Sequence, residues 1–270
     1  SPSMSNETYT SRGKLSTMGN WEGPALQHGE RDAARYRLPR WMNDGKRLVV
    51  VSDAGGEEAL EVHAAAGAEA PKRLAGLDIG RAMTLAVDPK ADRALVTNHR
   101  NELLCVDLAA GTLKKVDRSA FGSIRGAAWS PDGRWAAYGF HTSANISVIR
   151  LWDSKEGKVH DATAPVLRDA MPAWDPGGRY LYFLSHRDFD PVYDGLHFDL
   201  NFPRGSRPHL VTLRKDLPSP FVPAPKPLKK DKGDEAKADG KDKDAAKDGK
   251  DKKEEVKDVV IDLDGLTERV

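Results

Sequence analysis

The chain has 270 residues, a formal net charge of +1 and 39% hydrophobic residues. It lacks the concentrated basic surface that nucleic acids or anionic membranes require, so we expect neither as a partner. No apolar run reaches the ~18 residues of a membrane span, and 24 glycines with 17 prolines favour a turn-rich fold over a helical bundle.

Residues 1–10 are polar and begin Ser-Pro-Ser. They predict a disordered, tag-like N-terminus rather than the apolar core of a secretory signal, so we expect a cytoplasmic location. Residues 12–18 and 19–24 follow as two short outer strands of a blade whose beginning is absent. Cys105 is the only cysteine, which excludes an intramolecular disulfide and a zinc-thiolate cluster.

A short motif recurs four times along the middle of the chain. The segment W-S-P-D-G-R-W at 129–135 returns 45 residues later as W-D-P-G-G-R-Y at 174–180, and related copies begin at Trp41 and Val87. Each copy combines an apolar strand end, a tight turn with Pro or Asp-Gly, and a second apolar strand. Each therefore predicts a β-hairpin.

Every predicted hairpin is followed by further short strands and a glycine- or aspartate-containing turn. Four strands in about 45 residues, without helical periodicity between them, are typical of propeller blades. One blade cannot bury both faces of its sheet, so blades must stack around an axis. We predict an all-β propeller over residues 11–225, with four complete four-stranded blades and a partial N-terminal blade, within a larger ring.

The last blade carries a long insertion, residues 185–208, that is rich in aromatic and acidic side chains. Long loops of this kind on a rigid scaffold often carry binding sites, and a packed loop that seals a domain interface is the favoured interpretation. The aspartates do not have calcium-loop spacing. The candidate residues for a substrate channel or a domain interface are Arg187, Asp188, Asp190, Tyr193 and Arg204.

Motifs for catalysis are absent from the sequence: it contains no G-x-S-x-G, no H-E-x-x-H and no Walker loop. His99, His141 and His186 follow the second strands of their blades at equivalent positions, where a repeated turn residue is favoured over a metal or catalytic cluster. We therefore predict no catalytic residue, no metal site and no cofactor in this chain.

The C-terminal part changes composition abruptly. Residues 226–258 contain 12 lysines and 11 acidic residues with almost no large apolar side chain. This stretch predicts a charged disordered linker. Residues 259–270 are apolar and β-prone, and they predict the first strand of a following region.

The run from Phe183 to Phe221, F-L-S-H-R-D-F-D-P-V-Y-D-G-L-H-F-D-L-N-F-P-R-G-S-R-P-H-L-V-T-L-R-K-D-L-P-S-P-F, precedes the charged tract and then I-D-L-D-G-L at Ile261. Together with the copies of the W-S-P-D-G-R motif, it resembles the propeller region of tricorn-type serine proteases. The resemblance implies a large cytosolic peptidase that degrades peptides released by other proteases. In that family, two propellers precede a helical region, a PDZ-like domain and the domain that bears the catalytic Ser and His.

This chain resembles the second propeller only, so the catalytic groups would lie beyond Val270. The implied role is to gate or guide peptide substrates to a serine-protease domain absent from this chain. The implied partners are peptides, other domains of the same parent chain and further copies of the full-length parent. A free-standing TolB-like propeller that binds protein partners remains an alternative. A propeller attached to a prolyl-oligopeptidase-like hydrolase is a third interpretation, against which the I-D-L-D-G-L terminus argues.

Overall fold

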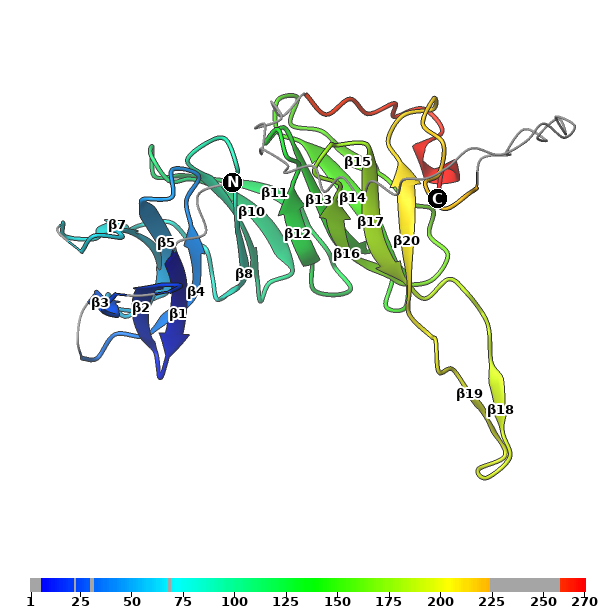
Figure 1. The fold of residues 1–270 in the computed structure, drawn as a ribbon, viewed down its shortest axis with the longest axis horizontal. Helices are drawn as coiled ribbons and strands as arrows, with labels where there is room; N and C mark the ends of the chain where they lie inside the picture. Colours follow the sequence, from blue (N-terminus) through cyan, green and yellow to red (C-terminus); the bar gives the residue numbers. More distant parts are fainter. Residues whose placement is uncertain (1–5, 22, 30–31, 68, 224–257) are drawn as a thin grey trace, which may run out of the picture.

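The computed structural model describes residues 6–21, 23–29, 32–67, 69–223 and 258–270. In this part of the chain, successive antiparallel sheets lie side by side in chain order (Figure 1), from the blue N-terminal sheet to the yellow-green last one. The propeller architecture is therefore confirmed. No helix among these residues is long and apolar enough to cross a membrane.

Within the described ranges, the sheets correspond to five blades. The first contains β1 (Asn6–Ser11), β2 (Lys14–Gly19) and β3 (Leu26–His28). The second contains β4 (Tyr36–Trp41), β5 (Arg47–Ser52), β6 (Ala59–Ala64) and β7 (Lys72–Leu74). The third contains β8 (Ala82–Val87), β9 (Arg93–Asn98), β10 (Glu102–Asp107) and β11 (Thr112–Arg118). The fourth contains β12 (Arg125–Trp129), β13 (Trp135–His141), β14 (Ser147–Asp153) and β15 (Val159–Asp161). The fifth contains β16 (Asp169–Trp174), β17 (Tyr180–Ser185) and β20 (Arg207–Thr212).

The repeated motif forms the turn between the first and second strands of a blade, as predicted. In three copies, Gly45, Gly133 and Gly178 adopt positive φ and donate a backbone hydrogen bond to the carbonyl three residues earlier. A Cβ on Gly133 would lie 2.5 Å from Asp88 Oδ1 in the preceding blade, so a side chain is also excluded by packing. The copy at Val87 has Ala91 instead of glycine, and in its turn Arg93 N donates a hydrogen bond to the carbonyl of Ala91, only two residues earlier.

In the second to fifth blades, the first strand borders the ring axis and contains a register shift. The shifts fall between Arg37 and Arg40, Ala82 and Thr84, Arg125 and Ala128, and Ala170 and Ala173. Leu38 and Met171 adopt positive φ within these bulges. Bulges bend a strand and re-aim its side chains, so the same device shapes the axial side of four successive blades.

Hydrophobic cores lie between neighbouring blades rather than within one blade. Leu15 packs with Tyr36 and Val50 between the first two blades, and separate clusters fill each of the three following interfaces among the described residues. Cys105 belongs to one of these clusters, and burial raises the pKa of its thiol to about 11. The second, third and fourth blades are therefore each stabilised by both neighbours, as expected for stacked repeats.

The fifth blade differs from the prediction of four complete four-stranded sheets, because its sheet has three strands. Residues 258–270, in red in Figure 1, run from the fourth blade, where Val259 N donates to Asp132 Oδ2 at 2.8 Å, to the fifth blade, where Asp262 N donates to Leu213 O at 2.9 Å. Val259 and Leu266 are buried in the core between the fourth and fifth blades.

The predicted strand at 259–270 is wrong. This segment contains no strand, only a 3-10 helix at Leu266–Glu268, because its residues pack onto the existing blades instead of starting a sheet. The predicted strand at 19–24 is also wrong: Trp21 is 95% exposed, and the third strand of the first blade is β3. The prediction of a disordered N-terminus over residues 1–10 is wrong for residues 6–10, which belong to β1 and pair with β2. Residues 1–5 and 226–257 lie outside the described residues.

Candidate functional site

The insertion in the fifth blade forms an arm that projects away from the ring. Its two strands are β18 (Val192–Asp194) and β19 (Asp199–Asn201), which pair antiparallel. Figure 1 shows the arm extending well beyond the ends of the other blades. The arm extends away from the blades of this chain, and its predicted role in sealing a domain interface stays a prediction.

Ion pairs fix the root of the arm. Arg187 Nη2 lies 2.7 Å from Asp169 Oδ2 at the start of β16, and the Asp169 side chain is 1% exposed. Asp188 accepts a hydrogen bond from His209 Nε2 at 3.1 Å, and Asp190 pairs with Arg207. Three of the five candidate residues are thus brought together as a brace that ties the segment after β17 to β16 and β20.

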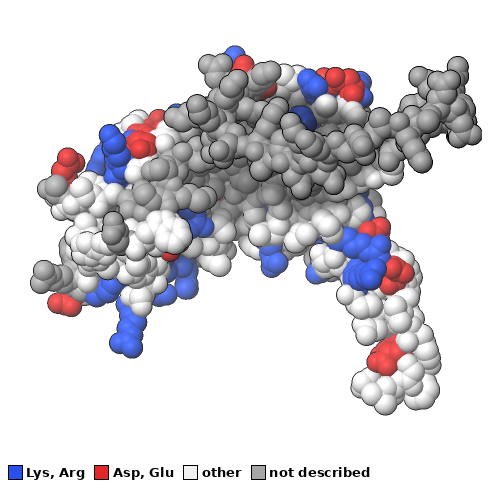
Figure 2. All heavy atoms as spheres, in the orientation of Figure 1, with Lys and Arg blue, Asp and Glu red and all other residues white. Residues whose placement is uncertain are grey.

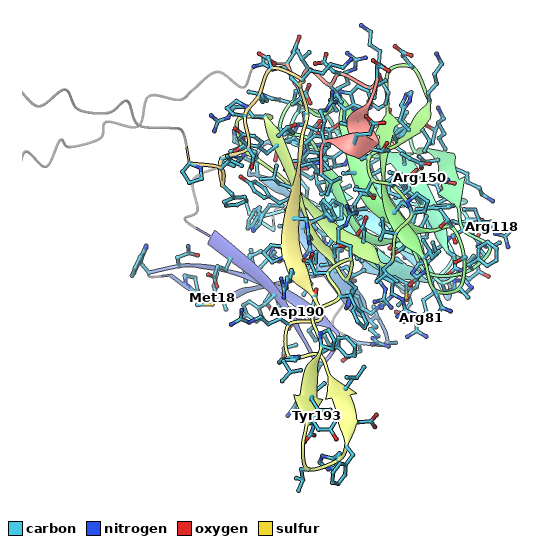
Figure 3. The ribbon with its side chains drawn as sticks, turned by 90° about the vertical axis from the view of Figure 1, so that its right-hand side faces the viewer. Met18, Arg81, Arg118, Arg150, Asp190 and Tyr193 are labelled. Atoms are coloured by element: carbon cyan, nitrogen blue, oxygen red, sulfur yellow. The ribbon has the colours of Figure 1, made fainter. Side chains whose placement is uncertain are left out.

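The outer part of the arm is apolar and uncovered. Tyr193 lies far along it, whereas Asp190 lies at its root (Figure 3). Arg204 follows β19 and is exposed. The exposed apolar side chains of the arm are Phe189, Val192, Tyr193, Leu196, Phe198, Leu200 and Phe202. A contiguous surface of this kind is typical of a site that contacts another protein.

Arginines mark the end of the ring from which the arm projects. Arg35, Arg81 and Arg168 precede the first strands of their blades, and each carbonyl accepts a backbone hydrogen bond from the residue after the second strand, namely Asp53, His99 or His186. The three arginines therefore occupy one structural position in three blades. Figure 3 shows Arg81 at the same end of the ring as Asp190, and Figure 2 shows basic side chains along this lower edge.

These three arginines and Arg125 in β12 are exposed. None of the four forms an ion pair with a carboxylate in the described ranges; Arg168, for example, bonds to the neutral Asn145 Oδ1 at 3.1 Å. Other arginines of the same end are neutralised, as in the pair of Arg37 with Glu58 at 2.7 Å. We name Arg35, Arg81, Arg125 and Arg168 the mouth arginines.

The mouth arginines affect His141, which follows β13. Burial lowers the pKa of His141, and the charges of Arg125 and Arg168 act in the same direction. His141 Nδ1 is buried without a hydrogen-bond partner among the described residues. The three repeated histidines do not meet: His99 Nδ1 instead accepts a hydrogen bond from Arg81 N at 3.0 Å. No group of three potential metal ligands occurs in the described part of the chain.

Glu102, at the start of β10, is the most strongly perturbed carboxylate of this end. Its side chain is 3% exposed, with Lys115 Nζ at 2.6 Å and Arg100 Nε at 2.9 Å. Burial alone would raise the Glu102 pKa, but hydrogen bonds from Asn98, Lys115 and Arg100 outweigh it and lower the pKa from 4.5 to about 2. The charge of Glu102 is therefore neutralised by Lys115 and Arg100, and it does not compensate the positive charge of the mouth arginines.

Sequence reasoning missed the mouth arginines, although a signal was present. Arg35, Arg81 and Arg168 each lie six residues ahead of the repeated motif, at Trp41, Val87 and Trp174. Aligning the copies upstream of the motif would have found them.

Comparisons with known proteins agree with this geometry. The family described as "Tricorn protease second beta propeller domain" matches residues 1–270. Tricorn protease homolog 1 of Streptomyces coelicolor is 38% identical over 217 residues, covering 78% of this chain and 20% of that protein. A tricorn protease homolog of Saccharolobus solfataricus is 32% identical, covering 75% of this chain and 18% of that protein. The chain thus spans about a fifth of the length of these relatives.

Solved structures show the same fold. The crystal structure of the tricorn protease superposes with a TM-score of 0.75 at 22% identity, covering 99% of this chain and 25% of that one. TolB from Agrobacterium tumefaciens superposes with a TM-score of 0.53 at 18% identity, covering 79% of this chain and 75% of that one. The match across the whole chain and the identity to the relatives decide the assignment. The chain belongs to the tricorn protease second β-propeller family.

Proposed function

We propose that this propeller segment admits and guides peptides toward a serine-protease domain carried elsewhere in a longer parent protein. The observation that carries the proposal is the set of mouth arginines, which present uncompensated positive charge at one end of the ring. Charge focused at an opening raises the local concentration of oppositely charged ligands. A peptide offers such charge in its C-terminal carboxylate and in Asp or Glu side chains.

The axial side of the blades suits an unfolded peptide in a second way. Met83 and Met171 lie on the innermost strands β8 and β16 and are 52% and 55% exposed. Methionine is flexible and polarisable, so it contacts varied side chains without strict selection. Positive charge at the opening followed by adaptable apolar contacts favours passage over tight, sequence-specific binding.

The arm supports a separate part of the proposal, in which it docks against another domain of the parent. Its root is fixed by the pair of Arg187 with Asp169, while its outer part exposes apolar side chains. A rigid root with an uncovered apolar end is suited to an interface between domains. Arg204 and Tyr193 would contribute to this interface, and the parent could associate further into oligomers.

The test is peptide binding measured by fluorescence anisotropy with sequence-matched acidic, neutral and basic peptides. We expect the acidic peptide to bind most tightly, and the double variant Arg81→Gln with Arg168→Gln to weaken it several-fold. Lys90→Gln is the matched control, because Lys90 is exposed in the turn at the opposite end of its blade. Absence of binding by every peptide, or equal weakening by the control variant, would contradict the proposal.

A further inference from the structure

A cavity of about 460 Å³ lies between the second and third blades, at the end of the ring that carries the mouth arginines. Three segments form its wall: the residue ahead of β4, residues 57–58 of the loop between β5 and β6, and the connection 77–81 between β7 and β8. Ligand pockets in proteins typically have volumes of about 300–1,000 Å³. The cavity therefore has room for a small molecule.

Two carboxylates of the cavity are engaged in fixing its wall. Glu58 Oε1 lies 2.7 Å from Arg37 Nη2, and Glu58 Oε2 accepts a hydrogen bond from Ala82 N at 2.9 Å. Asp78 Oδ2 lies 2.9 Å from Arg100 Nη1. Glu58 thus ties the second blade to the start of β8, and both carboxylates are neutralised by arginines of the protein itself.

Other charged side chains of the cavity have no hydrogen bond or ion pair with any described residue: Arg35, Glu57 and Arg81. Their backbones, in contrast, are held in place. Asp53 Oδ1 accepts a hydrogen bond from Arg35 N at 2.7 Å, and His99 Nδ1 accepts one from Arg81 N at 3.0 Å. Arg73 Nη2 donates to Glu57 O at 2.8 Å. Two cationic groups and one anionic group are therefore positioned at the cavity and left free to bind a ligand.

Leu77 and Ile79 supply the apolar part of the wall. Ile79 belongs to the core between the second and third blades and is 0% exposed, and Leu77 packs against the same core. These side chains offer contacts to methylene groups, while the free charges lie on other parts of the wall. The cavity thus suits a ligand whose charged groups are joined by a short aliphatic stem.

We propose that this cavity binds a free acidic α-amino acid, with its two carboxylates at Arg35 and Arg81 and its ammonium group at Glu57. The free charges decide the class of ligand, because two cations and one anion are complemented by two carboxylates and one ammonium group. Hydrogen bonds between guanidinium and carboxylate groups are among the strong ones in proteins. The site goes beyond the guidance of peptides and does not depend on it, because its ligand stays bound between two blades.

The test is an NMR titration of the intact chain at neutral pH and low salt, followed at the backbone amide of Gly80, which lines the cavity. The ligands are L-glutamate, N-acetyl-L-glutamate and L-glutamine. N-acetyl-L-glutamate keeps both carboxylates without the ammonium group and stands for the C-terminal residue of an acidic peptide, whereas L-glutamine lacks one carboxylate. Loss of one contact should weaken binding by about fivefold, so L-glutamate should bind more tightly than either analogue.

Variants separate the contacts of the ligand. Glu57→Gln should abolish the preference for L-glutamate over N-acetyl-L-glutamate, whereas Arg35→Gln should weaken the binding of both. Arg118→Gln is the matched control, because Arg118 is exposed at the end of β11 and lies outside the cavity.

The order of affinities distinguishes this site from a general attraction of anions to the mouth arginines. Attraction by charge alone favours N-acetyl-L-glutamate, which carries one more net negative charge than L-glutamate. Equal or tighter binding of N-acetyl-L-glutamate, no saturable shift of Gly80 with L-glutamate, or equal weakening by the control variant would overturn the proposed site. Each of these results would leave the guidance of acidic peptides to its own anisotropy test.

Discussion

The brace at the root of the arm gives the sharpest prediction about stability. Arg187→Met leaves the Asp169 carboxylate, 1% exposed, without its charged partner at 2.7 Å. Removing one member of a buried ion pair costs about 3–5 kcal/mol, because the remaining charge is neither solvated nor neutralised. We expect a loss of this size in the free energy of unfolding. Replacing both members, as Asp169→Asn with Arg187→Met, should restore more than half of it.

The matched control is Arg207→Met, which removes a pair whose side chains are 33% and 64% exposed. Exposed pairs contribute about 0–1 kcal/mol, so this variant should lie close to the parent. Urea unfolding monitored by circular dichroism at neutral pH measures all four proteins. A loss below about 1 kcal/mol for Arg187→Met, or equal losses for the two single variants, would refute the reasoning.

Three further predictions concern the charge of Glu102, a tryptophan hydrogen bond between two blades, and the arm. The Glu102 pKa lies near 2 instead of 4.5, so its contribution to stability is complete above pH 4.5 and is lost as the pH falls toward 2. Glu102→Gln should therefore flatten the fall of melting temperature in that range, and an unchanged pH profile would argue against it. Trp174 Nε1 donates a hydrogen bond to Ala128 O of the fourth blade at 3.1 Å, whereas the buried Trp135 indole N–H has no described partner. Trp174→Phe should therefore lower the free energy of unfolding in urea by about 1–2 kcal/mol more than Trp135→Phe. The double variant Leu196→Ser with Phe198→Ser should change stability by less than about 0.5 kcal/mol but reduce binding of a hydrophobic dye, and undiminished dye binding would count against the exposed arm.

The sequence predicted the hairpins because their determinants are local. Gly45, Gly133 and Gly178 supply the positive φ of the turn, so each copy of the motif specifies its own reversal. The repeat then predicted stacking, because one blade cannot bury both of its faces. Nothing more than spacing and turn chemistry was needed for this part of the fold.

Features that depend on distant contacts were not predictable in the same way. Val259 N donates to Asp132 Oδ2, and these residues are 127 positions apart in sequence. The β-prone composition of residues 259–270 suggested a strand, but Val259 and Leu266 are instead buried in the core between the fourth and fifth blades. The arm was recognised as unusual, whereas its projection depends on the brace at Arg187, which composition does not reveal.

The return of residues 258–270 to the fifth blade has a consequence for protein engineering. The backbone leaves the blade after Leu213 and comes back to it at Asp262, whose amide bonds to the Leu213 carbonyl. Lys215 N also donates to Asp262 Oδ2 at 2.9 Å, so departure and return are held at one point. Because the two ends of the segment between Lys215 and Asp262 are bonded to each other, a reporter domain inserted between them should leave the mouth arginines and the arm in place.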